Sequence, residues 1–142
     1  MNTSHDLVST VGDYAHATTT GNDAHALTTG YSSRATTAGQ RAHATTAGYS
    51  SRATATGDYA HALTTGQRAR ATTTGDYAHA TATGSDAHAT TAGYSAHALT
   101  TGYSAHAATT GANSIAVAIG YNSSARAANG GFIVLAQYDE DT

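Results

Sequence analysis

The repeat that decides the fold of this chain reads Gly93-Tyr94-Ser95-Ala96-His97-Ala98-Leu99-Thr100-Thr101. Nearly everything between residues 12 and 120 is a variant of this nonapeptide. Its glycine, which we number position one, returns every nine residues without insertion or deletion, at 12, 21, 30, 39, 48, 57, 66, 75, 84, 93, 102, 111 and 120. Such regularity is typical of a solenoid, in which each repeat forms one structural rung.

The composition argues against disorder and against helix. Leu, Ile, Val and Phe together number only thirteen in 142 residues, which alone would indicate disorder. The net charge of -3 is too small for a self-repelling chain, however, and small apolar residues recur at fixed positions. A nine-residue period makes two and a half helical turns, so no helix face would stay constant along the repeats. We therefore expect an ordered, all-β chain.

Each unit combines a turn with a strand. Glycine and its two followers form the turn, and the remaining positions alternate with the two-residue period of a strand. Ala or Ser at position four, Ala at position six and Thr or Ala at position eight can fill only a narrow gap. We expect these side chains between two closely packed sheets, with positions five, seven and nine pointing outward.

The number of units in each coil follows from where substitutions fall. If the unit beginning at Gly12 is the first, every position-five arginine lies in an odd unit and every position-seven leucine lies in an even unit. Sorting the units by threes separates neither set. We predict two strands and eighteen residues per coil, in a parallel β-solenoid of the two-sheeted β-roll type. An intertwined triple β-helix, the rival architecture, would leave the segregation unexplained.

We divide the chain into three parts. Residues 1–11 end in an apolar segment and are expected to form an N-terminal cap coil, because solenoids need atypical ends. Residues 12–128 form the nonapeptide-repeat β-roll. Residues 129–142 contain the one conventional strand, 132–138, followed by Asp139-Glu140-Asp141-Thr142, which is typical of a turn. This part is expected to be a capping strand or the start of a truncated hairpin.

The unit that begins at Gly111 departs from the theme. It continues as Ala112-Asn113-Ser114-Ile115-Ala116-Val117-Ala118-Ile119-Gly120-Tyr121-Asn122-Ser123-Ser124-Ala125. Over about residues 111–128 the chain resembles the head repeats of trimeric autotransporter adhesins. The resemblance implies a left-handed parallel β-roll that trimerises through its branched apolar row. The nonapeptides before it are also similar to uncharacterised repeat proteins of phages and prophages.

The outward face of the even units is the predicted interface. It combines a histidine column with leucines and an apolar C-terminal end, which is too apolar to be left in water. We expect eleven of its residues to be buried between chains: His25, His43, His61, His79, His97, Leu27, Leu63, Leu99, Ile115, Val117 and Ile119. The arginines of the odd units should remain exposed.

Two columns could bind ligands. His25, His43, His61, His79 and His97 are candidate metal ligands, but no Cys, Glu or Asp accompanies them on that face. We expect them to stack, assign no metal or other cofactor, and expect acidification to strain a buried column. The other column, Arg34, Arg52 and Arg70, could hold sulfate, phosphate or an acidic glycan through bidentate contacts, or could simply be solvated.

Further functions receive less support from the residues. Thr-x-Thr pairs that resemble ice-binding arrays occur at Thr18/Thr20, Thr54/Thr56, Thr72/Thr74 and Thr81/Thr83, although Leu and Ala interrupt them. The turn aspartates lack the Gly-Gly-x-Gly-x-Asp pattern of calcium-binding β-rolls. With one Glu and no strained nucleophile turn, no catalytic site can be assembled, so we predict that the chain is not an enzyme.

The charge and hydropathy patterns bear on location. A pI near 6.3 with scattered charges predicts no nucleic-acid partner, and no apolar run approaches membrane-spanning length. Residues 1–6 lack the pattern of a secretory signal.

We predict a structural or adhesive homotrimer, the shaft or head of a phage fibre or bacterial surface adhesin, with a cell-surface glycan or protein as a further partner. The alternatives are an ice-binding protein, a metal- or anionic-glycan-binding module, and a host-directed phage accessory protein.

Overall fold

The computed structural model describes residues 6–128 and 130–138, and all regular structure in them is β-strand. The first sheet contains, in spatial order, β1 (Leu7–Val11), β3 (His25–Thr29), β5 (His43–Ala47), β7 (His61–Thr65), β9 (His79–Thr83), β11 (His97–Thr101), β13 (Ile115–Ile119) and β15 (Phe132–Ala136). The second contains β2 (His16–Thr20), β4 (Arg34–Ala38), β6 (Arg52–Thr56), β8 (Arg70–Thr74), β10 (His88–Ala92), β12 (His106–Thr109) and β14 (Ser124–Arg126).

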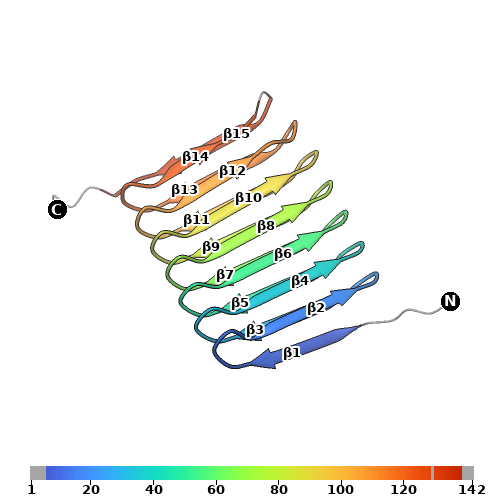
Figure 1. Ribbon diagram of the computed structural model, residues 1–142. Helices are drawn as coiled ribbons and strands as arrows, with labels where there is room; N and C mark the ends of the chain where they lie inside the picture. The colour runs from blue at the N-terminus through green and yellow to red at the C-terminus, as the bar shows by residue number, and fades with distance from the viewer. Residues whose placement is uncertain (1–5, 129, 139–142) are drawn as a thin grey trace.

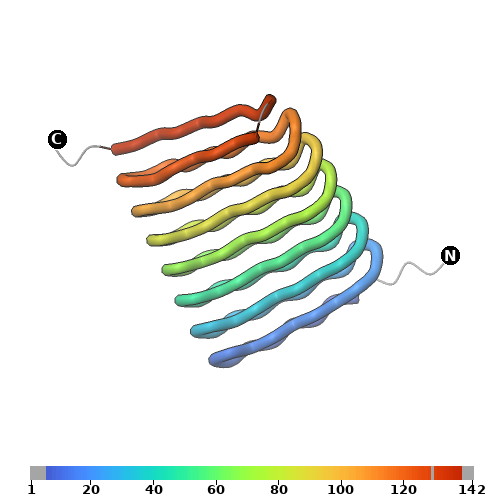
Figure 2. Tube along the Cα trace, turned by 45° about the horizontal axis from the view of Figure 1, so that its top comes forward, coloured from blue at the N-terminus to red at the C-terminus, as the bar shows by residue number. Residues whose placement is uncertain are grey.

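The two sheets form a parallel β-solenoid (Figures 1 and 2). Every strand pairs in parallel with the equivalent strand of the next coil, and Arg34 lies beside Arg52 just as His43 lies beside His61. These partners are eighteen residues apart, so one chain completes each coil with two nonapeptides. The prediction of a two-sheeted roll with even and odd units on separate sheets is confirmed, and the intertwined triple helix is not the architecture.

The core is a thin layer of small side chains. Alanines at position six, such as Ala35 and Ala53, are fully buried, and so are the threonines at position eight. The resulting burial pattern alternates along each strand, as the two-residue period predicts. Within the described residues, most of these buried threonine hydroxyls have no hydrogen-bond partner. The two sheets are therefore in contact mainly through van der Waals packing of small side chains.

The turns explain why position one must be glycine. These glycines have φ between 131° and 155° from Gly12 to Gly102, a region that side chains rarely adopt. A Cβ on Gly66 would lie 1.8 Å from the carbonyl oxygen of Gly48 in the coil before it. Most position-three residues adopt the left-handed backbone conformation, including Tyr77 with φ 58° and Arg68 with φ 56°. The repeat therefore fixes a tight turn that stacks directly on its neighbour.

The two ends of the described chain differ from the middle. The strand β1 pairs with β3, and β15 pairs in parallel with β13, so each extends the first sheet at opposite ends of the solenoid (Figure 1). Residues 132–136 thus add one more strand to the first sheet beside β13. The alternative of a hairpin turn at Asp139 to Thr142 falls outside the described residues.

Candidate functional site

The structure gathers the predicted interface residues on one surface. We call the outward side chains at positions five, seven and nine of the first sheet the first-sheet face; all eleven predicted residues lie on it. Leu27, Leu63 and Leu99 are 40%, 43% and 37% exposed. The histidines after His25, together with the apolar residues of β13, are half-buried in the single chain. Their burial between chains remains a prediction.

The histidines of this face form a stacked column. Ring centroids are 4.7 Å apart for His25 and His43, and 4.7 Å apart for His43 and His61, with interplanar angles of 2° and 4°. The stack continues to His79 at 4.9 Å and to His97, whose ring tilts by 30°. Parallel rings place their nitrogens side by side rather than converging on one point. Among the described residues no group of three or more His, Asp or Glu is arranged to hold a metal ion.

Packing also shifts the proton affinity of the column. Partial burial, and then the adjacent imidazole, lowers the pKa of His61 and of His79. The pKa of His43 is lowered in the same way, with the Asp23 carboxylate acting in the opposite direction. A lowered pKa in the folded state favours the neutral ring, so stacking favours the neutral form of these three histidines near pH 7.

We expect this column to make stability depend on pH. The folded pKa values lie below the unfolded value of about 6.5, so the unfolded chain binds more protons in this range. Stability should be fully present above about pH 6.5 and fall as the pH drops through the folded pKa values. Thermal unfolding followed by circular dichroism between about pH 7.5 and pH 5 measures this loss. In a His43→Gln, His61→Gln, His79→Gln variant the loss should be smaller, and an unchanged loss would contradict this explanation.

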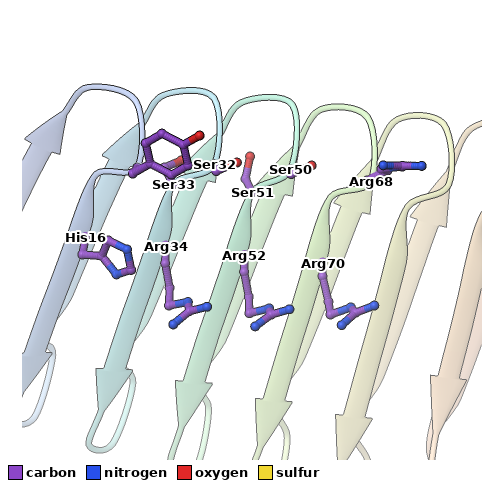
Figure 3. A pocket seen from close by; sticks show the side chains of 10 residues that line it. His16, Ser32, Ser33, Arg34, Ser50, Ser51, Arg52, Arg68 and Arg70 are labelled. Carbon is purple, nitrogen blue, oxygen red and sulfur yellow. The ribbon is translucent and has the colours of Figure 1, made fainter.

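The opposite sheet carries a basic groove. Arg34, Arg52 and Arg70 lie in register on β4, β6 and β8, and all three are exposed in the single chain. Their side chains extend in the same direction beside a row of turns (Figure 3). We call the hollow between them the Arg groove; its volume is about 410 Å³ and its lining residues are Tyr14, His16, Ser32, Ser33, Arg34, Ser50, Ser51, Arg52, Arg68 and Arg70. Arg68 was not among the predicted site residues. It could have been found, because the turns of the odd units must stack on one another just as the strands of those units do.

Other candidate residues have structural roles. The Asp76 carboxylate accepts a hydrogen bond of 2.8 Å from the backbone N–H of Tyr94, and that of Asp58 accepts one of 3.2 Å from Asp76. These aspartates thus link successive turns. Turn tyrosines stack in the same manner, with the rings of Tyr31 and Tyr49 5.1 Å apart.

The threonine pairs are divided between the sheets. Three of them, on β2, β6 and β8, lie on the second sheet, whereas Thr81 and Thr83 lie on β9 of the first. In register, position seven of the second sheet is threonine on five neighbouring strands, namely Thr18, Thr36, Thr54, Thr72 and Thr90. The column of position five beside it is His or Arg. A regular hydroxyl row therefore exists, next to a basic one.

The chain was compared with protein-family models, curated proteins and solved structures, and none of these matches it. In the described residues there is no helix that could cross a membrane.

Proposed function

We propose that the chain is a non-enzymatic structural module that forms a homotrimer through its first-sheet face and serves as a rigid shaft or head of a phage fibre or surface adhesin. The observation that carries the proposal is the contrast between the two outer faces. Arginines and a threonine row cover the second sheet, whereas leucines, half-buried histidines and the apolar residues of β13 cover the first. Exposed apolar side chains gathered on one face typically mark an interaction site.

The geometry supports contact between copies of this face around a common axis. The first-sheet face runs without a break from β1 to β13, because each position continues in register into the next coil. Leucine alternates with threonine at position seven from Leu27 through Thr45 and Leu63 to Leu99, which leaves spaces between the larger side chains. Copies of one chain could interlock such alternating rows. Trimeric rather than dimeric association follows from the adhesin resemblance of residues 111–128.

A charge placed in the centre of the face should prevent association. We expect Leu63→Asp to weaken self-association at least about tenfold, because burying an unpaired carboxylate costs more than the 1.4 kcal/mol that a tenfold change represents. Sedimentation velocity across a range of concentrations measures the change.

Thr72→Asp is the matched control. Thr72 occupies position seven of β8 on the opposite sheet, so the variant carries the same charge at an equivalent place outside the proposed interface. Its association should match that of the unaltered chain. Equal weakening by both substitutions, or by neither, would contradict an interface on the first sheet.

Ice binding is the second candidate, and the threonine row of the second sheet favours it. Five threonines in register at position seven form a regular outward array of the kind that could order water. Thermal hysteresis of a dilute solution tests the idea. A freezing-point depression that Thr54→Leu abolishes would support ice binding, and its absence in the unaltered chain would eliminate it.

A further inference from the structure

The Arg groove concentrates positive charge that the described chain does not neutralise. Among its ten lining residues four are arginines and none is acidic. The one ion pair in the described residues joins Arg41 Nη2 to Asp23 Oδ2 at 2.8 Å, and both lie in the other row of turns. The groove therefore presents three arginines in register and a fourth, Arg68, from a turn above them (Figure 3).

This arrangement is unfavourable without a counter-ion. Like charges on neighbouring strands repel each other. Partial burial, and then the charges of Arg34 and Arg70, lowers the pKa of Arg52. An anion bound along the row would relieve this repulsion.

The turns beside the groove also differ from the others. The segment Gly-Tyr-Ser-Ser-Arg occurs twice, at 30–34 and 48–52, and each time leads into an arginine of the row. In the described part of the chain, most turns have a left-handed residue at position three, but Ser32 and Ser50 are not left-handed. Their half-buried side chains line the groove, and Ser51 Oγ donates a hydrogen bond of 2.6 Å to the carbonyl of Gly48. The two turns at 30–34 and 48–52 thus differ from the others both in sequence and in backbone conformation.

We propose that the Arg groove binds a short stretch of a linear acidic polysaccharide, laid along the solenoid axis with one carboxylate or sulfate per sugar. Arginine binds both anions bidentately. Parallel strands repeat at about 4.8 Å, a step comparable to the advance of an extended sugar chain by one ring. The hydroxyls of Tyr14, Ser32 and Ser50 line the same groove and can bond to sugar hydroxyls.

A nucleic acid fits the groove less well. Phosphates of one duplex strand advance by about 3.4 Å, which is shorter than the strand spacing. Single strands are held by rows of aromatic rings on which successive bases stack. Tyr14 is the one tyrosine among the lining residues of the groove, and Tyr31 and Tyr49 stack on each other outside it. The net charge of -3 also opposes general attraction to a polyanion, so binding must come from the local row.

The proposal is tested with labelled oligogalacturonate of about four sugars, whose binding is followed by fluorescence anisotropy; the length matches the four neighbouring strands β2, β4, β6 and β8 that line the groove. A sulfated dextran fragment distinguishes sulfate from carboxylate, and neutral dextran is the uncharged control. We expect saturable binding of one or both acidic oligomers that weakens with salt, and none of neutral dextran. Stronger binding of an oligothymidylate, or equal competition by inorganic sulfate at the same anion concentration, would overturn the polysaccharide assignment.

The variants localise the site. Arg52→Gln should weaken binding about tenfold or more, and Arg52→Lys by an intermediate factor, because lysine keeps the charge but not the bidentate geometry. Arg126→Gln is the matched control, since Arg126 is exposed on β14 of the same sheet but does not line the groove. Circular dichroism checks that each variant is folded. Equal losses in Arg52→Gln and Arg126→Gln would mean that only net charge matters and would overturn the site. The groove lies on the second sheet, so this result is independent of the proposed trimer.

Discussion

Replacing Gly66 with alanine should unfold the middle of the solenoid. The new Cβ would lie 1.8 Å from the carbonyl oxygen of Gly48, which is part of the rigid turn of the previous coil. The backbone at Gly66, with φ of 139°, is also strained for alanine, at about 1–3 kcal/mol. Backbone strain and the steric clash together should lower the free energy of unfolding by more than about 4 kcal/mol, a loss that few single substitutions cause. Urea unfolding followed by circular dichroism measures this loss of stability.

Gly12→Ala separates the clash from the strain. Gly12 has a similar φ of 143°, but among the described residues, its chain neighbours apart, no heavy atom lies within 4 Å of where its Cβ would be. Its cost should stay within the strain term of about 1–3 kcal/mol. Equal destabilisation by the two substitutions would show that direct stacking of turns does not limit the repeat. In Gly66→Ala, unfolding in two steps is also expected, because each coil is stabilised only by its neighbours.

Enlarging a core alanine is the second severe change. Ala53 is fully buried in β6 between two other alanines of its column, Ala35 and Ala71. Short turns join the two sheets at both edges of every coil, so the sheets cannot move apart locally to accept leucine. Overpacking typically costs about 1–3 kcal/mol, and Ala53→Leu should reach or exceed the upper value because the core is so thin.

Ala38→Leu is the control, because it adds the same side-chain atoms at a solvent-exposed position. Ala38 occupies the outward position nine of β4 in the same sheet and is exposed. Its substitution should change the free energy of unfolding by no more than about 0.5 kcal/mol. Both values come from urea titration under identical conditions. A similar, small effect of both substitutions would indicate a loose interior and contradict the close packing of the sheets.

The coil could be predicted because two independent columns obey the same parity. Arginines mark the odd units and leucines the even ones, and strand alternation then fixes which side chains face inward. Position one of each unit identified the turn. These features depend only on residue size and spacing, which are visible in the sequence, and the structure bears them out from Gly12 to Gly120.

The turn conformations could not be predicted in the same way. Tyr77 and Arg68 are left-handed although neither residue type favours that region, because the stacked coils impose it. Because the turn conformation could not be predicted, the sequence did not indicate that the Arg68 side chain lines the Arg groove. Ring stacking of the histidines was expected from their spacing, but their partial burial depends on packing against neighbouring side chains that spacing alone does not reveal.

The two proposals assign separate uses to the two faces of the solenoid. The rigid roll itself supplies length and stiffness, the first-sheet face supplies the proposed contact between chains, and the second-sheet face leaves the Arg groove open to solvent. A trimer built in this way would display three grooves outward. Multiple weak sites on one particle bind a repetitive surface with much higher avidity than any one of them alone.

Light scattering of the intact chain at micromolar concentration and about pH 7.5, where the lowered pKa values of His43, His61 and His79 favour neutral rings, tests the proposed assembly most directly. The chain has a mass of 14.2 kDa, so the account predicts three times that mass, about 43 kDa. A mass of 14.2 kDa would contradict association through the first-sheet face.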